Sequence, residues 1–137
     1  MAYTGGDIIE VTYSHPTVGS GILQIKSNED TTVKKGGFMT DDDASGITGG
    51  GEAIYKMSRT RWEAELGPVA WDMTDRDELT KLQEMASSPL EADWTFGVVN
   101  GAVWSGKGKP VGDIAGNTNA ATIAVKLAGG GTLSKQA

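Results

Sequence analysis

An eighteen-residue segment from Lys34 to Gly51 constrains the fold of this chain more than any other feature. It contains six glycines and no proline, and its only large apolar residues are Phe38, Met39 and Ile47. Strand-like runs flank it on both sides. Compact domains rarely contain so long a connection unless it has a function or is disordered. Because the segment cannot bury itself within one subunit, we expect it to stay mobile there and to become ordered against something else.

Alternation of apolar and polar residues predicts antiparallel β-strands. In Asp7 to Tyr13, the side chains of Ile9, Val11 and Tyr13 share one face. Twenty glycines also fit a β-rich chain with many turns better than a helical bundle. Further strands are expected at Gly21 to Ser27, after the Asn28 to Val33 turn, at Ala53 to Leu66 and at Ala120 to Leu127.

The strand predicted at Ala53 to Leu66 changes its apolar phase. Tyr55 and Met57 occupy odd positions, whereas Trp62 and Ala64 occupy even ones. A strand whose buried face changes midway either contains a bulge or passes from one environment into another.

One helix and one tight hairpin complete the predicted elements. Thr74 is the expected N-cap, and apolar residues follow at helical spacing as far as Ala86. Their single stripe predicts a peripheral helix outside the sheet. The pair Asn100-Gly101 predicts a two-residue type I′ turn, with Trp104 opposite Gly97. The fold class expected is mainly β with this one helix, an antiparallel β-sandwich or half-barrel with a long extended hairpin loop.

Composition narrows the class of protein. The 137 residues suffice for one domain, with the extended loop at Lys34 to Gly51 and a flexible tail at Gly129 to Ala137. No cysteine is present, so there is neither a disulfide nor a thiolate metal site. The beginning of the chain does not resemble a signal peptide, and no membrane span is predicted. A net charge of −6 argues against a protein that binds the phosphate backbone of nucleic acids.

The order and spacing of these elements resemble those of the bacteriophage tail tube proteins. The resemblance extends from about Asp7 to Gly129 without a short diagnostic motif. The stretches that carry it are the start of the loop at Asn28 to Gly36, the Ser58 to Ala64 strand, the Asp75 to Ala86 helix, the Asn100-Gly101 hairpin, the Gly106-Lys-Gly-Lys-Pro-Val-Gly loop and the closing strand Ala120 to Leu127.

The resemblance implies a structural virion protein and no enzyme. Its subunits would form stacked homohexameric rings, a helical assembly that is the viral tail tube and the conduit for DNA ejection into the host. Genomic DNA would pass through without specific binding. Further partners would be the tail sheath, tape measure, baseplate and tail terminator proteins, and assembly would take place in the bacterial cytoplasm. The candidate contacts between rings all lie in or beside the loop: Lys34, Lys35, Phe38, Met39, Asp41, Asp42, Asp43 and Ile47.

Three local motifs invite a chemical interpretation. Gly101 to Gly108 nearly spells a phosphate-binding loop, but it lacks the final hydroxyl and does not join a strand to a helix. The Asp41 to Asp43 triplet lacks the alternating donors and distal glutamate of a calcium loop, so a solvated patch or an ion pair between subunits is favoured. His15 is the only histidine, which makes a catalytic or metal site there unfavourable. No cofactor is predicted.

The four tryptophans leave a second function open. They could form a stacking platform in a monomeric β-sandwich module that binds carbohydrate, although most of them occupy positions typical of core or interface packing. No pair of acids has a context able to raise one pKa for acid catalysis. The main expectation is therefore a self-assembling structural subunit, and the alternative is a monomeric binding module. The tryptophans are Trp62, Trp71, Trp94 and Trp104.

Overall fold

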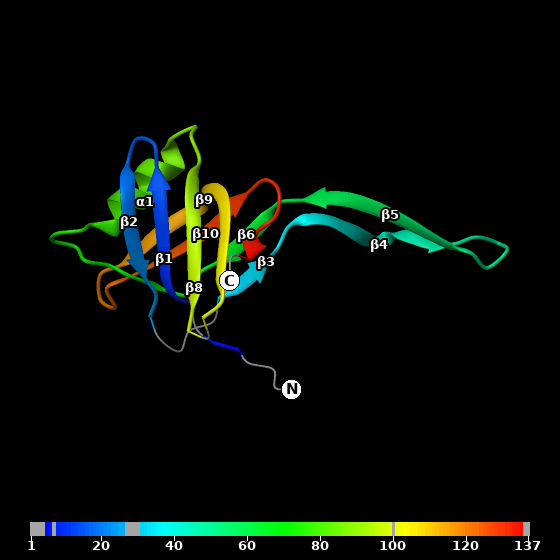
Figure 1. Cartoon of the computed structure of the whole chain (residues 1–137), viewed down its shortest axis with the longest axis horizontal. Coiled ribbons are helices and arrows are strands. Elements are labelled where there is room, and N and C mark those ends of the chain that lie inside the picture. Colours follow the sequence, from blue (N-terminus) through cyan, green and yellow to red (C-terminus); the bar gives the residue numbers. More distant parts are fainter. Residues whose placement is uncertain (1–4, 7, 27–30, 100, 136–137) are drawn as a thin grey trace.

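The structure is a computed structural model that describes residues 5–6, 8–26, 31–99 and 101–135. This part of the chain forms eleven strands and one helix, which confirms the mainly antiparallel β fold with a single helix (Figure 1). In chain order they are β1 Ile8–His15, β2 Gly19–Gln24, β3 Thr32–Lys34, β4 Gly37–Ile47, β5 Ala53–Thr60, β6 Trp62–Glu65, β7 Val69–Ala70, α1 Glu78–Ser87, β8 Ala92–Val98, β9 Val103–Asn117, β10 Thr122–Gly129 and β11 Ser134–Lys135.

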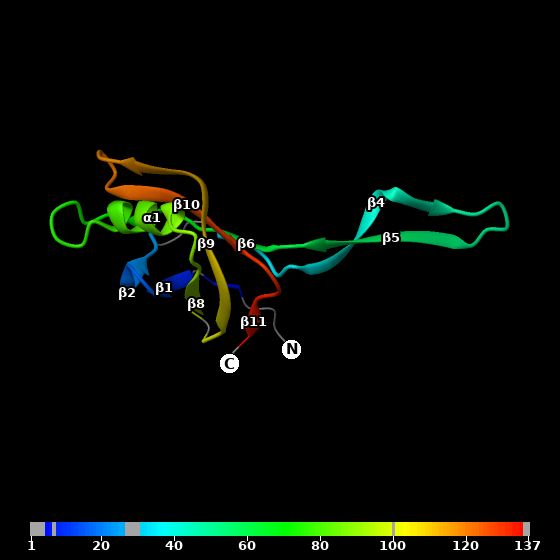
Figure 2. The same ribbon diagram turned by 90° about the horizontal axis from the view of Figure 1, so that it is seen from above.

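Nine of these strands form one curved sheet. Its main order is β2-β1-β8-β9-β10-β6-β3, with β11 beside β9 and β7 beside β10. The long strand β9 pairs with β8 along its first half and with β10 along its second, and so passes from one layer to the other (Figure 2). An isolated bridge joins Ile25 to Val69, which brings the end of β2 close to β7. The sheet therefore curves around its own core.

Aromatic residues on β1, β6 and β8 occupy the centre of that core. Trp62 and Trp94 are at most 1% exposed, and each donates its indole N–H to a carbonyl of β9 at 3.0 Å. The Trp62 ring meets Phe96 edge to face, with 6.2 Å between the ring centroids. Buried indoles need such hydrogen-bond partners, and the two carbonyls are those of Lys107 and Gly108. These two hydrogen bonds therefore link the core tryptophans to adjacent residues of β9.

The segment Gly106 to Gly112 was predicted to be a loop, and this prediction was wrong, because it lies within β9. Gly108 is buried, and a Cβ there would lie 2.2 Å from the carbonyl oxygen of Ala128 in the neighbouring strand. A Cβ on Gly106 would lie 2.6 Å from the Leu133 side chain. These glycines allow close packing between strands, and a segment that lies within a strand cannot form a phosphate-binding loop at a helix N-terminus.

The hairpin between β8 and β9 exists, but its register was predicted wrongly. The Val98 N–H donates to the carbonyl of Ala102, so the turn has three residues instead of two. Trp104 consequently lies opposite Phe96 and not opposite Gly97. Gly101 has φ of +93°, as expected for the glycine that ends a three-residue turn. Asn100 lies outside the described residues.

The helix begins later than predicted. Residues before it form a turn in which the Asp72 carboxylate accepts hydrogen bonds from the N–H groups of Thr74 and Asp75, so Thr74 is not the N-cap. α1 starts at Glu78, and its buried apolar side chains are Leu82 and Met85. The single apolar stripe is confirmed, and the helix packs mainly against β9 at the periphery of the sheet. Its end before Ser88 agrees with the sequence.

Two further boundaries differ from those predicted. The strand expected from Ala53 to Leu66 divides at Arg61, and only its second part, β6, enters the core. Of the predicted tail, Gly129 belongs to β10, Leu133 is 1% exposed, and β11 pairs with β9. The residues as far as 135 are therefore part of the fold, and residues 136–137 lie outside the described residues. Within the described ranges no helix has the length and apolar character needed to cross a bilayer.

Candidate interaction surface

The segment from Lys34 to Gly51, expected as the loop of a long extended hairpin, forms most of one strand of a protruding hairpin. Among the described residues, β4 and β5 pair only with each other, from Gly37 opposite Thr60 to Ile47 opposite Ala53. Figures 1 and 2 show this hairpin extending away from the rest of the molecule. We call residues 37–60 the arm and the rest of the described chain the body.

Large apolar side chains of the arm are exposed to solvent on both of its faces. Paired residues of an antiparallel ladder share a face, so the register places Phe38 and Ile47 of β4 with Tyr55 and Met57 of β5. These four side chains are 62% to 73% exposed. Met39 and Ile54 lie on the opposite face and are about half exposed. Monomeric proteins rarely expose so much contiguous apolar surface, which favours an interaction surface.

An irregularity divides the arm between Asp41 and Gly46. The hydroxyl of Ser45 donates to the carbonyl oxygen of Asp41 and accepts a hydrogen bond from the N–H of Lys56 at 3.1 Å. The Asp41 carboxylate accepts a hydrogen bond from Ser58, which lies on the same face. Side-chain hydrogen bonds thus replace the ladder where it is interrupted, and the strand bends there.

The arm is acidic at this irregularity and at its tip, and basic at its base. Asp42, Asp43 and Glu52 are exposed and have no ion-pair partner within the described residues. At the base, the Arg59 guanidinium lies 5.4 Å from the centroid of the Phe38 ring, which is a cation–π distance.

A single carboxylate, Glu63, lies among three cations at the base of the arm. Arg61 Nε lies 2.9 Å from it, Lys126 Nζ 3.3 Å and Lys34 Nζ 3.8 Å. The hydrogen bond from Arg61 lowers the pKa of Glu63, and the Lys126 ammonium adds to the effect. One carboxylate cannot neutralise three cations, so the base of the arm carries excess positive charge.

The structure therefore brings together only some of the residues predicted as contacts. Phe38 and Ile47 share one face of β4, while Met39 and Asp41 share the other. Lys34 belongs to β3 and its neighbour Lys35 is exposed between β3 and β4. Sequence reasoning missed Ile54, Tyr55, Met57 and Arg59, because alternation on β5 was interpreted as a half-buried strand.

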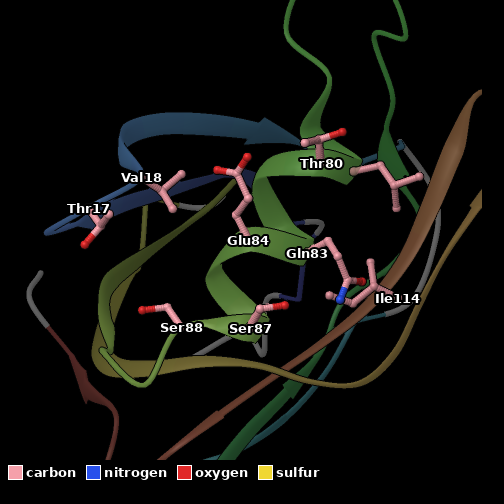
Figure 3. Close-up of a pocket in the computed structure, with 9 residues that line it drawn as sticks. Thr17, Val18, Thr80, Gln83, Glu84, Ser87, Ser88 and Ile114 are labelled. Carbon is pink, nitrogen blue, oxygen red and sulfur yellow. The ribbon is translucent and has the colours of Figure 1, made fainter.

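The body contains a groove of about 640 Å³ between α1 and the β1–β2 turn (Figure 3), and both of these elements lie at the end of the body away from the arm (Figure 1). Its floor is apolar, and its rim carries hydroxyl and amide groups from α1 and the β1–β2 turn. Among its described lining residues only Glu84 has an ionisable side chain, so the groove lacks a pair of groups for acid–base chemistry. The lining consists of Thr17, Val18, Leu79, Thr80, Gln83, Glu84, Ser87, Ser88 and Ile114.

His15 has a structural contact beside this groove. It is 3% exposed, and its Nδ1 accepts hydrogen bonds from the N–H groups of Thr17 and Val18 at 3.1 Å each. The imidazole therefore holds the β1–β2 turn. No group of three or more His, Cys, Asp or Glu side chains able to hold a metal ion occurs in the described part of the chain.

The tryptophans do not form a stacking platform. Trp62 and Trp94 are buried, and Trp71 and Trp104 are partly buried against the same core. A carbohydrate-binding platform requires exposed ring faces, so the feature that suggested a carbohydrate module belongs to the core instead.

No protein-family model matches this chain, and no curated protein is significantly similar to it.

Proposed function

We propose that this protein is a structural subunit that assembles with copies of itself into the tube of a bacteriophage tail. The subunits form stacked hexameric rings, and the tube conducts DNA into the host. The observation that carries the proposal is the arm, a protruding hairpin whose large apolar side chains are mostly exposed on a chain that otherwise buries its core.

The energetics of the arm favour association. Burying a large apolar side chain contributes roughly 1.5 to 3 kcal/mol. Phe38, Ile47, Tyr55 and Met57 on one face therefore represent several kcal/mol that a lone subunit does not gain. The arm also presents two strand edges without neighbours, and exposed edges pair readily with other strands.

The distribution of charge is compatible with a conduit for DNA. A channel that held many lysines and arginines would retain DNA through counterion release. This chain is acidic overall, with a net charge of −6. We therefore expect DNA to pass without being bound.

Removing the arm tests the proposal. Gly37 and Thr60 lie opposite each other at its base, so a short Gly-Ser turn can replace residues 38–59 without moving the body. We expect this variant to remain folded by circular dichroism, because these residues add nothing to the buried core. It should form no tubes in electron micrographs under conditions where the full chain does. Tubes of normal length from the shortened chain would show that the arm has no role in assembly.

A further inference from the structure

The base of the arm contains a groove of about 560 Å³ on the side of the Gly130–Gly131 turn. Phe38 and Thr132 contribute apolar surface to it, and Arg59 and Arg61 supply the charge. The Arg59 guanidinium lies 5.4 Å from the centroid of the Phe38 ring, and a guanidinium has five N–H donors to offer an acceptor. No described carboxylate pairs with Arg59. The groove thus has the chemistry to receive a segment with both apolar and acidic side chains.

Such a segment exists in the same chain. The distal half of the arm carries Asp42, Asp43 and Glu52 beside the exposed side chains of Ile47 and Tyr55. Asp42 and Asp43 follow Phe38 by four and five residues, or about 15 Å of strand. This separation is close to two Debye lengths at physiological salt, so within one copy the acidic and basic parts hardly compensate each other.

We infer that the groove at the base of the arm receives the distal half of the arm of a second copy. In this contact Asp42 and Asp43 of one copy pair with Arg59 and Arg61 of the next, while Ile47 and Tyr55 pack against Phe38. Arginine suits this role because its planar guanidinium binds carboxylates through two parallel hydrogen bonds, in a bidentate geometry. The inference rests on the proposed self-assembly and identifies the two surfaces that meet.

The contact has a definite symmetry. The two surfaces are different, so each copy offers one of each and the contact is head to tail. Head-to-tail contacts that do not close into a ring continue indefinitely. The acidic and basic ends then set the register between copies, whereas the apolar side chains contribute most of the free energy.

A charge exchange between two variants tests the inference. The distal variant carries Asp42→Arg and Asp43→Arg, and the base variant carries Arg59→Glu and Arg61→Gln. Each variant alone loses the charge attraction of the contact, because arginine meets arginine in the distal variant and glutamate meets aspartate in the base variant. We expect at least a tenfold loss of assembled material in sedimentation. Mixed in equal amounts, the two variants can alternate, and every contact becomes attractive again. We expect the mixture to recover most of the assembly of the unmodified chain.

Controls separate this inference from the proposed function. A matched variant, Glu91→Arg with Asp113→Arg, changes two exposed acids of the body and should assemble normally. If the unmodified chain does not assemble, the proposed function fails. If it assembles and either charge variant assembles equally well alone, or the mixture does not recover, the inference fails and the proposed function stands.

Crosslinking gives a second readout if a charge variant does not fold. The chain has no cysteine, so Asp43→Cys and Arg59→Cys can be introduced together without competing thiols. Oxidation of the assembled protein should produce a ladder of covalent multimers. A pattern no different from that of Asp43→Cys combined with Glu91→Cys would overturn the contact.

Discussion

Gly101 is held in a conformation that side chains disfavour. Its φ of +93° places it in the region that glycine adopts freely and β-branched residues adopt only under strain. Apart from Gly101 itself and its two neighbours in the chain, no described atom lies within 4 Å of the position of an added Cβ. Any effect of substitution there is therefore due to the backbone and not to a steric clash.

We expect Gly101→Val to lower the free energy of unfolding by about 1 to 3 kcal/mol, the usual cost of a strained backbone position. Gly101→Asn serves as the control and should cost less, because asparagine tolerates positive φ better than other residues. Urea unfolding of the three proteins measures both effects. Equal midpoints for the Val variant and the unmodified chain would mean that the turn is placed incorrectly.

The glycines of β9 explain why a loop was predicted where the structure has a strand. Gly106 and Gly108 beside lysine and proline are typical of a loop, yet they lie in a strand against Trp62. A side chain at either position would meet the Trp62 indole, which lies more than forty residues earlier in the chain. The residues next to these glycines therefore do not reveal why glycine is required. The register of the β8–β9 hairpin was missed for a related reason, since the choice between two and three turn residues depends on how Phe96 and Trp104 pack.

At the scale of elements, the sequence predicted the strands and the helix that bury one face against the core. Alternation located β1 and β10, and the helical stripe located α1, because burial on the body imposes a period on the sequence. β4 carries no such pattern, since its side chains meet no core. The candidate contacts Phe38, Met39 and Ile47 were recognised by the absence of anything that could bury them. Their partners on β5 resembled an ordinary strand and were missed.

The division of β5 from β6 at Arg61 leads to a prediction about stability. We expect Trp62→Ala on β6 to lower the free energy of unfolding by about 3 to 5 kcal/mol, because it removes a fully buried indole. Tyr55→Ala on β5 is the control, and it should change that free energy by no more than about 0.5 kcal/mol, as is usual at exposed sites. Urea denaturation at low protein concentration measures both in the unassembled state. A large loss for Tyr55→Ala would mean that the arm packs against the body.

At the scale of the molecule, the buried and exposed apolar residues occupy different places. The body buries most of its large apolar side chains in one core, although Ile22, Val33, Met73, Leu90 and Val99 are exposed, whereas the arm exposes nearly all of its own. Charge is divided as well, with four carboxylates and one lysine in the distal arm and the cations around Glu63 at its base. A protein that acted alone would gain nothing from this division, whereas a subunit that contacts copies of itself uses both parts.

The central claim is that the chain assembles with itself through the arm, and electron microscopy of the purified full chain tests it most directly. Negatively stained samples over a range of protein concentrations should show rings at low concentration and tubes of uniform diameter with a central channel at high concentration. Particles of a single 14.3 kDa chain at every concentration would contradict the account.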